Sequence, residues 1–161
     1  CIEILGNLGY THALRIDEDC LIQSSLNNFF DEITGYPDGL IGTPAMFEES
    51  HQLTNQILPN FLRLTGINYT HSWDESYYTS SPMVYSNVNL YFIKNILENQ
   101  ECLIFLKNIK DSAVIHRCRL GDAPLLFWLS QVKSNALHVF QTIKYQHLSH
   151  RMEVAGGKVI K

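Results

Sequence analysis

Segments with the period of a β strand alternate along this chain with segments with the period of an α helix. The pattern predicts strands over residues 10–16, 40–43, 84–91 and 137–141. It predicts one helix that begins at Ser24 or Ser25 and ends near Ile33. Further helices are predicted over residues 48–64, 93–106 and 121–132. Alternating strands and helices favour an α/β fold with a mixed sheet flanked by helices. With 161 residues, 45% of them hydrophobic, the chain is long enough for one domain with its own core.

The composition argues against several partners. The net charge is -4 and no cluster of Lys and Arg follows any segment, so we expect no nucleic-acid partner. The longest apolar runs, such as residues 123–129, are far shorter than the roughly 20 residues that span a bilayer, so membrane contact would need a segment outside this sequence. No Cys-x-x-Cys pair occurs, which excludes a zinc ribbon, and three full disulfide pairings stay open for the four cysteines.

An acidic cluster follows the first predicted strand. Asp17 and Asp19 are two residues apart, so on extended backbone both carboxylates would point to the same side and reach one ion. Carboxylate oxygens suit magnesium or manganese, and such an ion neutralises the charge that grows on a diphosphate leaving group. By itself the pattern is more typical of a solvated turn, so the interpretation depends on the rest of the chain.

Four motifs supply that context, and they occur in a fixed order. They are Arg15, Asp17 and Asp19 in residues 10–19; Ser86-Asn87 in residues 84–89; Arg-Leu-Gly-Asp-Ala-Pro over residues 119–124; and a closing strand that leads to Tyr-x-His, ending at His147. Together they resemble the motifs of the yeast-type Golgi α-1,2-mannosyltransferases, whose members use GDP-mannose and manganese on a GT-A fold. The resemblance covers residues 10–150 and is most specific at residues 119–124.

The resemblance implies a fold, a donor and a location. It implies a GT-A-like mixed sheet flanked by helices, with residues 1–150 as the C-terminal portion of a catalytic domain and residues 151–161 as a tail. Because the sequence begins at Cys1, we expect a fragment that lacks most of the N-terminal nucleotide-binding half. The implied activity is the retaining, metal-assisted transfer of a sugar, mannose above all, from a nucleotide sugar to a glycan hydroxyl. The implied compartment is the Golgi lumen.

The resemblance also assigns roles to individual residues. Asp17 and His147 would ligate manganese, and Asp19 would ligate it or hold the donor ribose or water ligands; an oxygen and imidazole shell suits this metal. Asp122 would approach the hydroxyls of the donor sugar, and Arg119 would pair with a nearby carboxylate or phosphate. The remaining donor-binding positions are Arg15, Ser86 and Asn87.

Asn89 departs from the family pattern, because the family has a glutamate there. An amide cannot act as a carboxylate nucleophile, so either the acceptor attacks from the front face with the leaving diphosphate as base, or another carboxylate takes part. The candidates are Glu48, Glu49, Asp74 and Glu75. A catalytically impaired module that still binds a sugar nucleotide is therefore the alternative function.

Several features have two interpretations. His147 and His150 are spaced as a metal pair on a helix, which would suit a metallohydrolase, but they equally suit two surface histidines. An aromatic segment over residues 69–82 would stack on acceptor sugars or pack as a lid on its own core. Gly156-Gly157 indicates a flexible tail.

Overall fold

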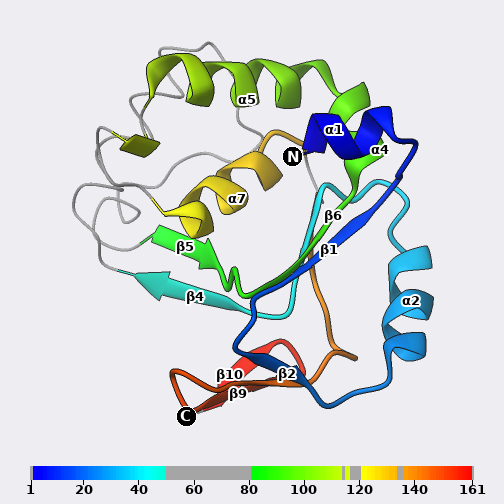
Figure 1. Ribbon diagram of the computed structural model, residues 1–161, viewed down its shortest axis with the longest axis vertical. Coiled ribbons are helices and arrows are strands. Elements are labelled where there is room, and N and C mark those ends of the chain that lie inside the picture. Colours follow the sequence, from blue (N-terminus) through cyan, green and yellow to red (C-terminus); the bar gives the residue numbers. More distant parts are fainter. Residues whose placement is uncertain (1, 50–80, 114, 117–120, 134–135, 161) are drawn as a thin grey trace.

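The computed structural model describes residues 2–49, 81–113, 115–116, 121–133 and 136–160. These residues form a mixed α/β structure with helices on both sides of a central sheet (Figure 1). Its helices are α1 (Ile2–Asn7), α2 (Leu26–Thr34), α4 (Ile93–Glu98), α5 (Gln100–Ser112) and α7 (Asp122–Ser130). In the described part of the chain, no helix is both long and apolar enough to cross a membrane.

The central sheet is mixed, as predicted. Its strands are β1 (Ala13–Ile16), β6 (Val88–Tyr91), β3 (Ile41–Thr43) and β7 (Leu137–Val139), in that spatial order. The pairs β1/β6 and β6/β3 are antiparallel and β3/β7 is parallel. Strands β4 (Met46–Glu49) and β5 (Ser81–Val84) form a separate two-stranded ribbon.

A second sheet is antiparallel throughout and lies at the end of the molecule that holds the C-terminus (Figure 1). Its strands follow the order β10 (Lys158–Ile160), β9 (Met152–Ala155), β8 (Tyr145–His147) and β2 (Cys20–Ile22). The predicted flexible tail is therefore wrong. Gly156 and Gly157 both have positive φ angles, of 54° and 74°, which is the backbone of a tight two-residue turn between paired strands.

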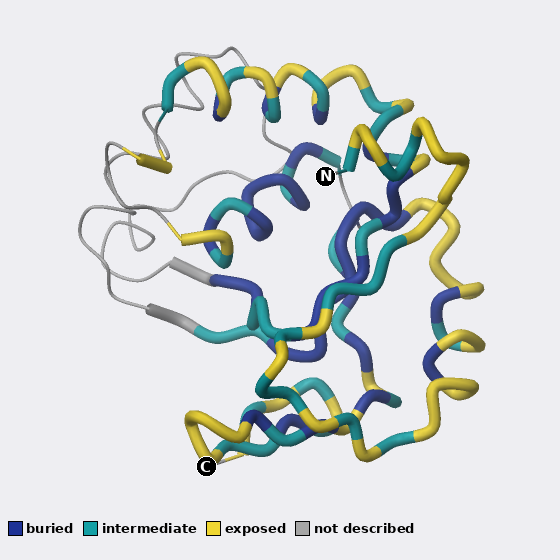
Figure 2. The backbone as a smooth tube through the Cα atoms, viewed as in Figure 1, coloured by how far each residue is buried: buried dark blue, intermediate teal, exposed yellow. Residues whose placement is uncertain are grey.

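Two hydrophobic clusters hold these layers together, and Figure 2 shows the buried segments gathered at the central sheet. Strand β6 contributes side chains to the clusters on both faces of the central sheet. Val88 and Leu90 join the cluster beneath α2, whereas Tyr91 packs against the cluster beneath α5 and α7. Because side chains alternate along a strand, Asn89 points to the α7 side of the sheet.

Four predicted segments differ in the structure. The strand expected over residues 84–91 is two strands, because Tyr85 N donates to Ala45 O while Asn87 O accepts from Asp17 N, so the chain changes its partner between β5 and β6. The helix expected over residues 93–106 breaks at Asn99, whose side chain caps α5 by accepting from Cys102 N at 2.9 Å. Residues 48–49 belong to β4 rather than to a helix, and residues 81–82 belong to β5 rather than to a loop. Residues 50–80 lie outside the described residues.

Candidate functional site

The acidic segment lies at the end of β1, as the sequence predicts. Its backbone is a turn: Asp17 N donates to Asn87 O at 2.8 Å, and Cys20 N donates to Asp17 O at 3.0 Å. The expectation of extended backbone at Asp17 and Asp19 is therefore wrong. Their arrangement follows from the turn and from the residues that the turn meets.

The turn meets His147 through the second sheet. Strands β2 and β8 pair with Cys20 opposite His147, so the histidine lies beside the acidic turn although 128 residues separate it from Asp19. His147 Nε2 is 3.0 Å from Asp19 Oδ2, and the histidine is only 4% exposed. Ser149 Oγ donates to the same carboxylate at 2.5 Å. This hydrogen bond lowers the pKa of Asp19, with the nearby His147 acting in the same direction.

Asn87 lies between Asp17 and His147. Its amide nitrogen donates to Asp17 Oδ2 at 3.1 Å and lies 3.4 Å from His147 Nε2. Ser86 precedes it in the segment that joins β5 to β6. The Ser-Asn motif and the acidic motif, which are far apart in the sequence, therefore meet here.

Arg15 joins the acidic turn to the start of α7. Its Nε and Nη2 lie 3.1 and 3.0 Å from Asp17 Oδ1, and its Nη1 forms an ion pair with Asp122. The hydrogen bond with Asp122 raises the pKa of Arg15, and Tyr91 adds a further hydrogen bond. Two carboxylates share this cation, so a bound anion would find a guanidinium that is already oriented.

Asn89 lies opposite Arg15 in the β1/β6 pair and is fully buried. Neither Nδ2 nor Oδ1 of its amide has a hydrogen-bond partner among the described residues. Buried amides nearly always have hydrogen-bond partners. An unpaired amide here is not explained by packing and suggests a role in binding.

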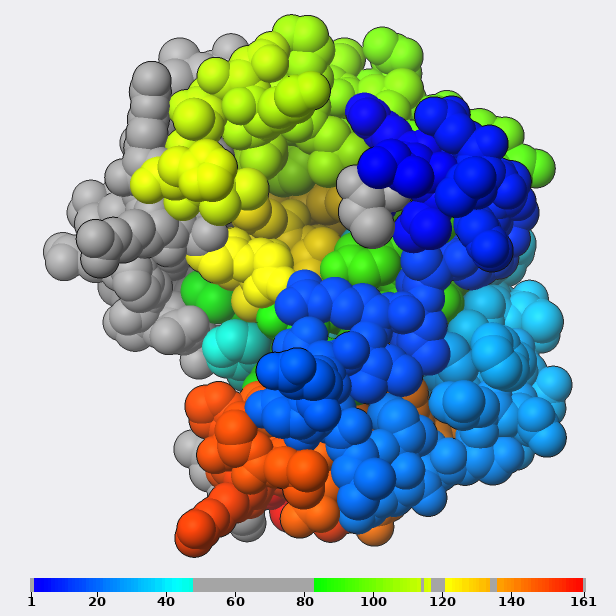
Figure 3. Space-filling model, viewed as in Figure 1, coloured from blue at the N-terminus to red at the C-terminus, as the bar shows by residue number. Residues whose placement is uncertain are grey.

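We call this group the strand-end site; its members are Arg15, Asp17, Asp19, Asn87, Asn89, Asp122 and His147. Figure 3 shows the segments that carry it on one face: β1 and β2 in blue, the start of α7 in yellow and the chain after β8 in orange. Arg119 lies outside the described residues, as do Asp74, Glu75 and the aromatic residues over 69–80. Glu48 and Glu49 lie on β4.

The donor set suits manganese, which accepts carboxylate oxygen and imidazole nitrogen. At metal–ligand distances of roughly 2.1 Å, adjacent octahedral donors are about 3 Å apart. The 3.0 Å between Asp19 Oδ2 and His147 Nε2 fits such a pair. Within the described residues, however, no three His, Cys, Asp or Glu side chains are grouped as a metal centre requires. Asp17 reaches His147 only through the Asn87 amide.

Tyr85 and Ser149 were missed by the sequence analysis as partners of the histidine. Tyr85 Oη lies 2.9 Å from His147 Nδ1, and Ser149 Oγ lies 3.1 Å from Nε2. Burial raises the pKa of Tyr85, so its hydroxyl stays protonated. The aromatic position before Ser86-Asn87 was a sequence signal for Tyr85, whereas Ser149 had none. The expected second histidine, His150, has its ring centroid 4.5 Å from that of His147.

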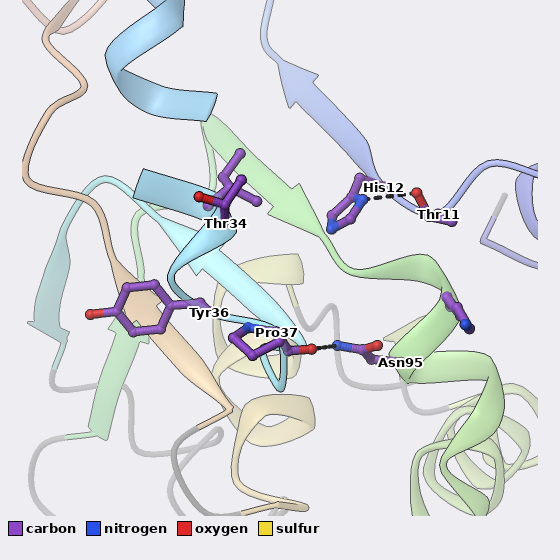
Figure 4. Close-up of a pocket in the computed structure, with 8 residues that line it drawn as sticks. Thr11, His12, Thr34, Tyr36, Pro37 and Asn95 are labelled. Atoms are coloured by element: carbon purple, nitrogen blue, oxygen red, sulfur yellow. Dashed lines mark hydrogen bonds between the residues drawn. The ribbon is translucent and has the colours of Figure 1, made fainter. Parts of the chain in front are cut away.

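A cavity of about 280 Å³ lies elsewhere, near the start of β1 (Figure 4). It is formed where β1, the end of α2 and the start of α4 meet, and its walls include His12, Tyr36 and Asn95. Within the wall of this cavity, the Asn95 amide donates to Pro37 O at 2.7 Å. No member of the strand-end site lines it.

Comparison with known proteins identifies the fold. No protein-family model and no curated protein matches the sequence. Among solved structures, core-mannan synthase A of Aspergillus fumigatus in its Mn/GDP form has a TM-score of 0.65 at 13% identity, over 91% of this chain and 45% of that one. The mannosyltransferase Ktr4p of S. cerevisiae has a TM-score of 0.66 at 16% identity, over 86% of this chain and 41% of that one. A further structure of Ktr4p, in complex with GDP, also matches.

This chain has a glycosyltransferase-like fold. The predicted mixed sheet flanked by helices is confirmed, and the chain spans less than half the length of the solved structures it matches. At 13–16% identity the similarity concerns the fold alone.

Proposed function

We propose that this chain carries part of the active site of a glycosyltransferase that moves a sugar, with mannose the favoured one, from a nucleotide sugar to a glycan hydroxyl. The observation that carries the proposal is the meeting of Asp19 and His147 at 3.0 Å, next to the bridge between Arg15 and Asp122. The chain has the fold of two mannosyltransferases, one of them solved with Mn and GDP. In this fold, the cluster combines side chains that can bind a metal ion, Asp19 and His147, with the guanidinium of Arg15, which can bind a phosphate.

Asp19 and His147 would hold manganese, whose positive charge would stabilise the leaving diphosphate. Asp17 is held by Arg15 and Asn87, so its carboxylate stays oriented toward the same region. Arg15 would exchange one of its two carboxylates for a phosphate oxygen, since the geometry of a guanidinium suits both. This exchange would free the Asp122 carboxylate, at the start of α7, for the sugar hydroxyls.

Asn89 would contribute hydrogen bonds rather than a covalent bond. Its amide is buried and unpaired within the described part of the chain, and it is not a carboxylate nucleophile. We therefore favour transfer with retention in which the acceptor attacks from the face of the leaving group and the diphosphate oxygen takes its proton. The alternative, a module that binds the sugar nucleotide without transferring it, rests on the same residue.

The test measures GDP-mannose turnover by the intact protein with manganese, in the parent and in variants. Asp19→Asn and Asp17→Ala should each lower the rate about 100-fold or more, because the first removes a carboxylate that would hold the metal and the second removes the carboxylate that orients Arg15. Asp111→Asn is the matched control, since it removes an exposed carboxylate that pairs only with Lys107 among the described residues. Full activity in Asp17→Ala would remove Asp17 from the site.

Calorimetry and activity assays distinguish the transferase from a module that only binds the sugar nucleotide. Manganese-dependent binding of GDP, together with no donor hydrolysis and no transfer across a panel of acceptors, would identify a binding module. Turnover that needs both manganese and Asp19 would exclude it.

A further inference from the structure

Tyr85 lies between β5 and β6, where the chain passes from the ribbon to the central sheet. Its ring packs edge-on against Phe47, with centroids 5.9 Å apart, and its hydroxyl lies 2.9 Å from His147 Nδ1. The residue therefore contacts the histidine from the side opposite Asp19. Packing against Phe47 keeps the ring in place when only the hydroxyl is changed.

The His147 ring is held at both nitrogens, and the partners fix where its proton lies. A neutral imidazole has one N–H donor and one acceptor nitrogen. Two groups compete for Nε2: the Asp19 carboxylate at 3.0 Å only accepts, and the Asn87 amide nitrogen at 3.4 Å only donates. The carboxylate is the nearer of the two, so we place the proton of the neutral ring on Nε2. Nδ1 is then the acceptor, and the Tyr85 hydroxyl donates to it.

Coordination through Nε2 reverses this assignment. The nitrogen must offer a lone pair, so the proton of the neutral ring has to lie on Nδ1. A buried N–H without an acceptor is unfavourable, and metal-ligating histidines normally donate their other N–H to a fixed partner. A hydroxyl oxygen suits both states, because it donates in one and accepts in the other.

We infer that Tyr85 is a positioning residue of the strand-end site, whose hydroxyl holds the His147 ring in both tautomers and thereby lets Nε2 serve as a metal ligand. The role in metal binding rests on the proposed function. The hydrogen bond between Tyr85 and His147 in the metal-free protein does not. Ser149 cannot replace Tyr85, because it lies on the Nε2 side of the ring.

Tyr145 provides a matched control. It is fully buried, its ring centroid is 6.4 Å from that of Tyr85, and its hydroxyl has no hydrogen-bond partner in the part of the chain that the structure describes. Tyr85→Phe and Tyr145→Phe therefore delete the same atom from neighbouring rings. Only the first deletes a contact with His147.

The first measurement is the ¹⁵N spectrum of the histidine side chains in the metal-free protein, with His147 assigned through His147→Gln. In the parent and in Tyr145→Phe, Nδ1 should resonate as a hydrogen-bonded acceptor nitrogen and Nε2 as the protonated one. In Tyr85→Phe, the Nδ1 resonance should move toward that of an acceptor without a partner. An Nδ1 resonance that stays in place would overturn the inference.

The second measurement is the affinity for Mn²⁺ in the presence of GDP, followed by the electron paramagnetic resonance of the free ion. Tyr85→Phe should bind Mn²⁺ about 10- to 100-fold more weakly than the parent, and Tyr145→Phe should match the parent. Equal affinities for Tyr85→Phe and Tyr145→Phe would overturn the role in metal binding. If the parent itself retains no Mn²⁺, the metal centre is wrong and the role of Tyr85 in metal binding falls with it, even where the spectrum confirms its hydrogen bond.

Discussion

Two carboxylate–histidine pairs in this protein look alike by distance and differ in everything around them. Glu32 Oε1 lies 2.7 Å from His138 Nε2 in one, and Asp19 Oδ2 lies 3.0 Å from His147 Nε2 in the other. Each pair joins residues more than 100 positions apart in the sequence. The first connects α2 to β7, and the second connects the acidic turn to β8.

The Glu32–His138 pair is closed, by which we mean that both carboxylate oxygens have hydrogen-bond partners within the protein. Glu32 also accepts hydrogen bonds from the backbone of Gln141 and Thr142 and from the Thr142 hydroxyl, at 2.5–3.0 Å. Tyr36 stacks on His138 with ring centroids 3.4 Å apart, and the side chains of the pair are 12% and 8% exposed. Both carboxylate oxygens are thus occupied, so this cluster fastens a helix to a loop.

The strand-end site is open by comparison. The Asp19 side chain is 33% exposed, and the neighbouring Asn89 amide has no partner among the described residues. A cluster whose hydrogen-bonding groups are all matched holds the fold together, whereas one that leaves groups unmatched is available to a ligand. The difference predicts opposite responses to mutation.

Glu32→Ala should cause the largest loss, about 3–5 kcal/mol in the free energy of unfolding, because it leaves a buried histidine and two backbone N–H groups without their acceptor. Urea unfolding followed by tryptophan fluorescence measures it. Asp19→Ala is the counterpart and should cost less, because the Ser149 hydroxyl lies 3.1 Å from Nε2 of the buried His147 and can accept in place of the carboxylate. Equal losses in the two variants would remove the distinction between a closed and an open pair.

Asn89→Val should act in the opposite direction and stabilise the protein by about 1–3 kcal/mol, because it deletes two buried polar atoms that have no partner. Valine also suits the interior of a strand. Donor turnover should fall in the same variant if the amide contacts the sugar. Urea unfolding and the GDP-mannose assay measure the two effects.

Thr43→Val is the control for this substitution. Thr43 is also fully buried, but its hydroxyl donates to Ala45 O at 3.0 Å, so the change should cost about 1 kcal/mol. If Asn89→Val destabilised the protein as Thr43→Val does, the amide would be satisfied in solution and the site would not be open at this position.

Much of the fold could be predicted from local signals. Ser25 caps α2 by accepting from Asn27 N, as its position before an amphipathic segment indicates. Helix α7 is largely buried after its first turn and has no amphipathic period. Its start at Asp122, with Pro124 in the first turn, could still be predicted from the turn and cap residues. These signals depend on neighbours in the sequence.

The strand-end site depends on pairing between distant segments, which local signals do not encode. Strands β2 and β8 have three residues each, too few for a period to emerge, yet their register is what sets His147 beside Asp19. The resemblance to a known family indicated that His147 and the acidic segment belong together. It gave no indication that Asn87 would lie between Asp17 and His147, because that contact follows from the change of partner between β5 and β6.

The smallest expected effect is on how the free energy of unfolding falls at acidic pH. Burial by itself would raise the pKa of Glu32, but hydrogen bonds from Thr142, Gln141 and His138 outweigh it and lower the pKa below the ordinary 4.5. A carboxyl whose pKa is lower in the folded state contributes stability that is present above its unfolded pKa and is lost as the pH falls through the folded pKa. Glu32→Gln should therefore flatten the decline of stability below about pH 4.5, by a fraction of the loss expected for Glu32→Ala.

Urea unfolding of the parent and of Glu32→Gln, between about pH 6 and about pH 3, measures this difference in slope. The pKa of Asp19 is lowered as well, chiefly by the Ser149 hydroxyl and further by the charge of His147. The Asp19 side chain is partly exposed, so the part of the slope removed by Asp19→Asn that comes from the His147 charge should shrink when salt is added. The slope removed by Glu32→Gln should persist in salt, because the closed pair is shielded from the solvent. A salt response of the same size in both variants would mean that the two pairs are equally open to water and that the strand-end site is no more accessible to a ligand than the Glu32–His138 pair.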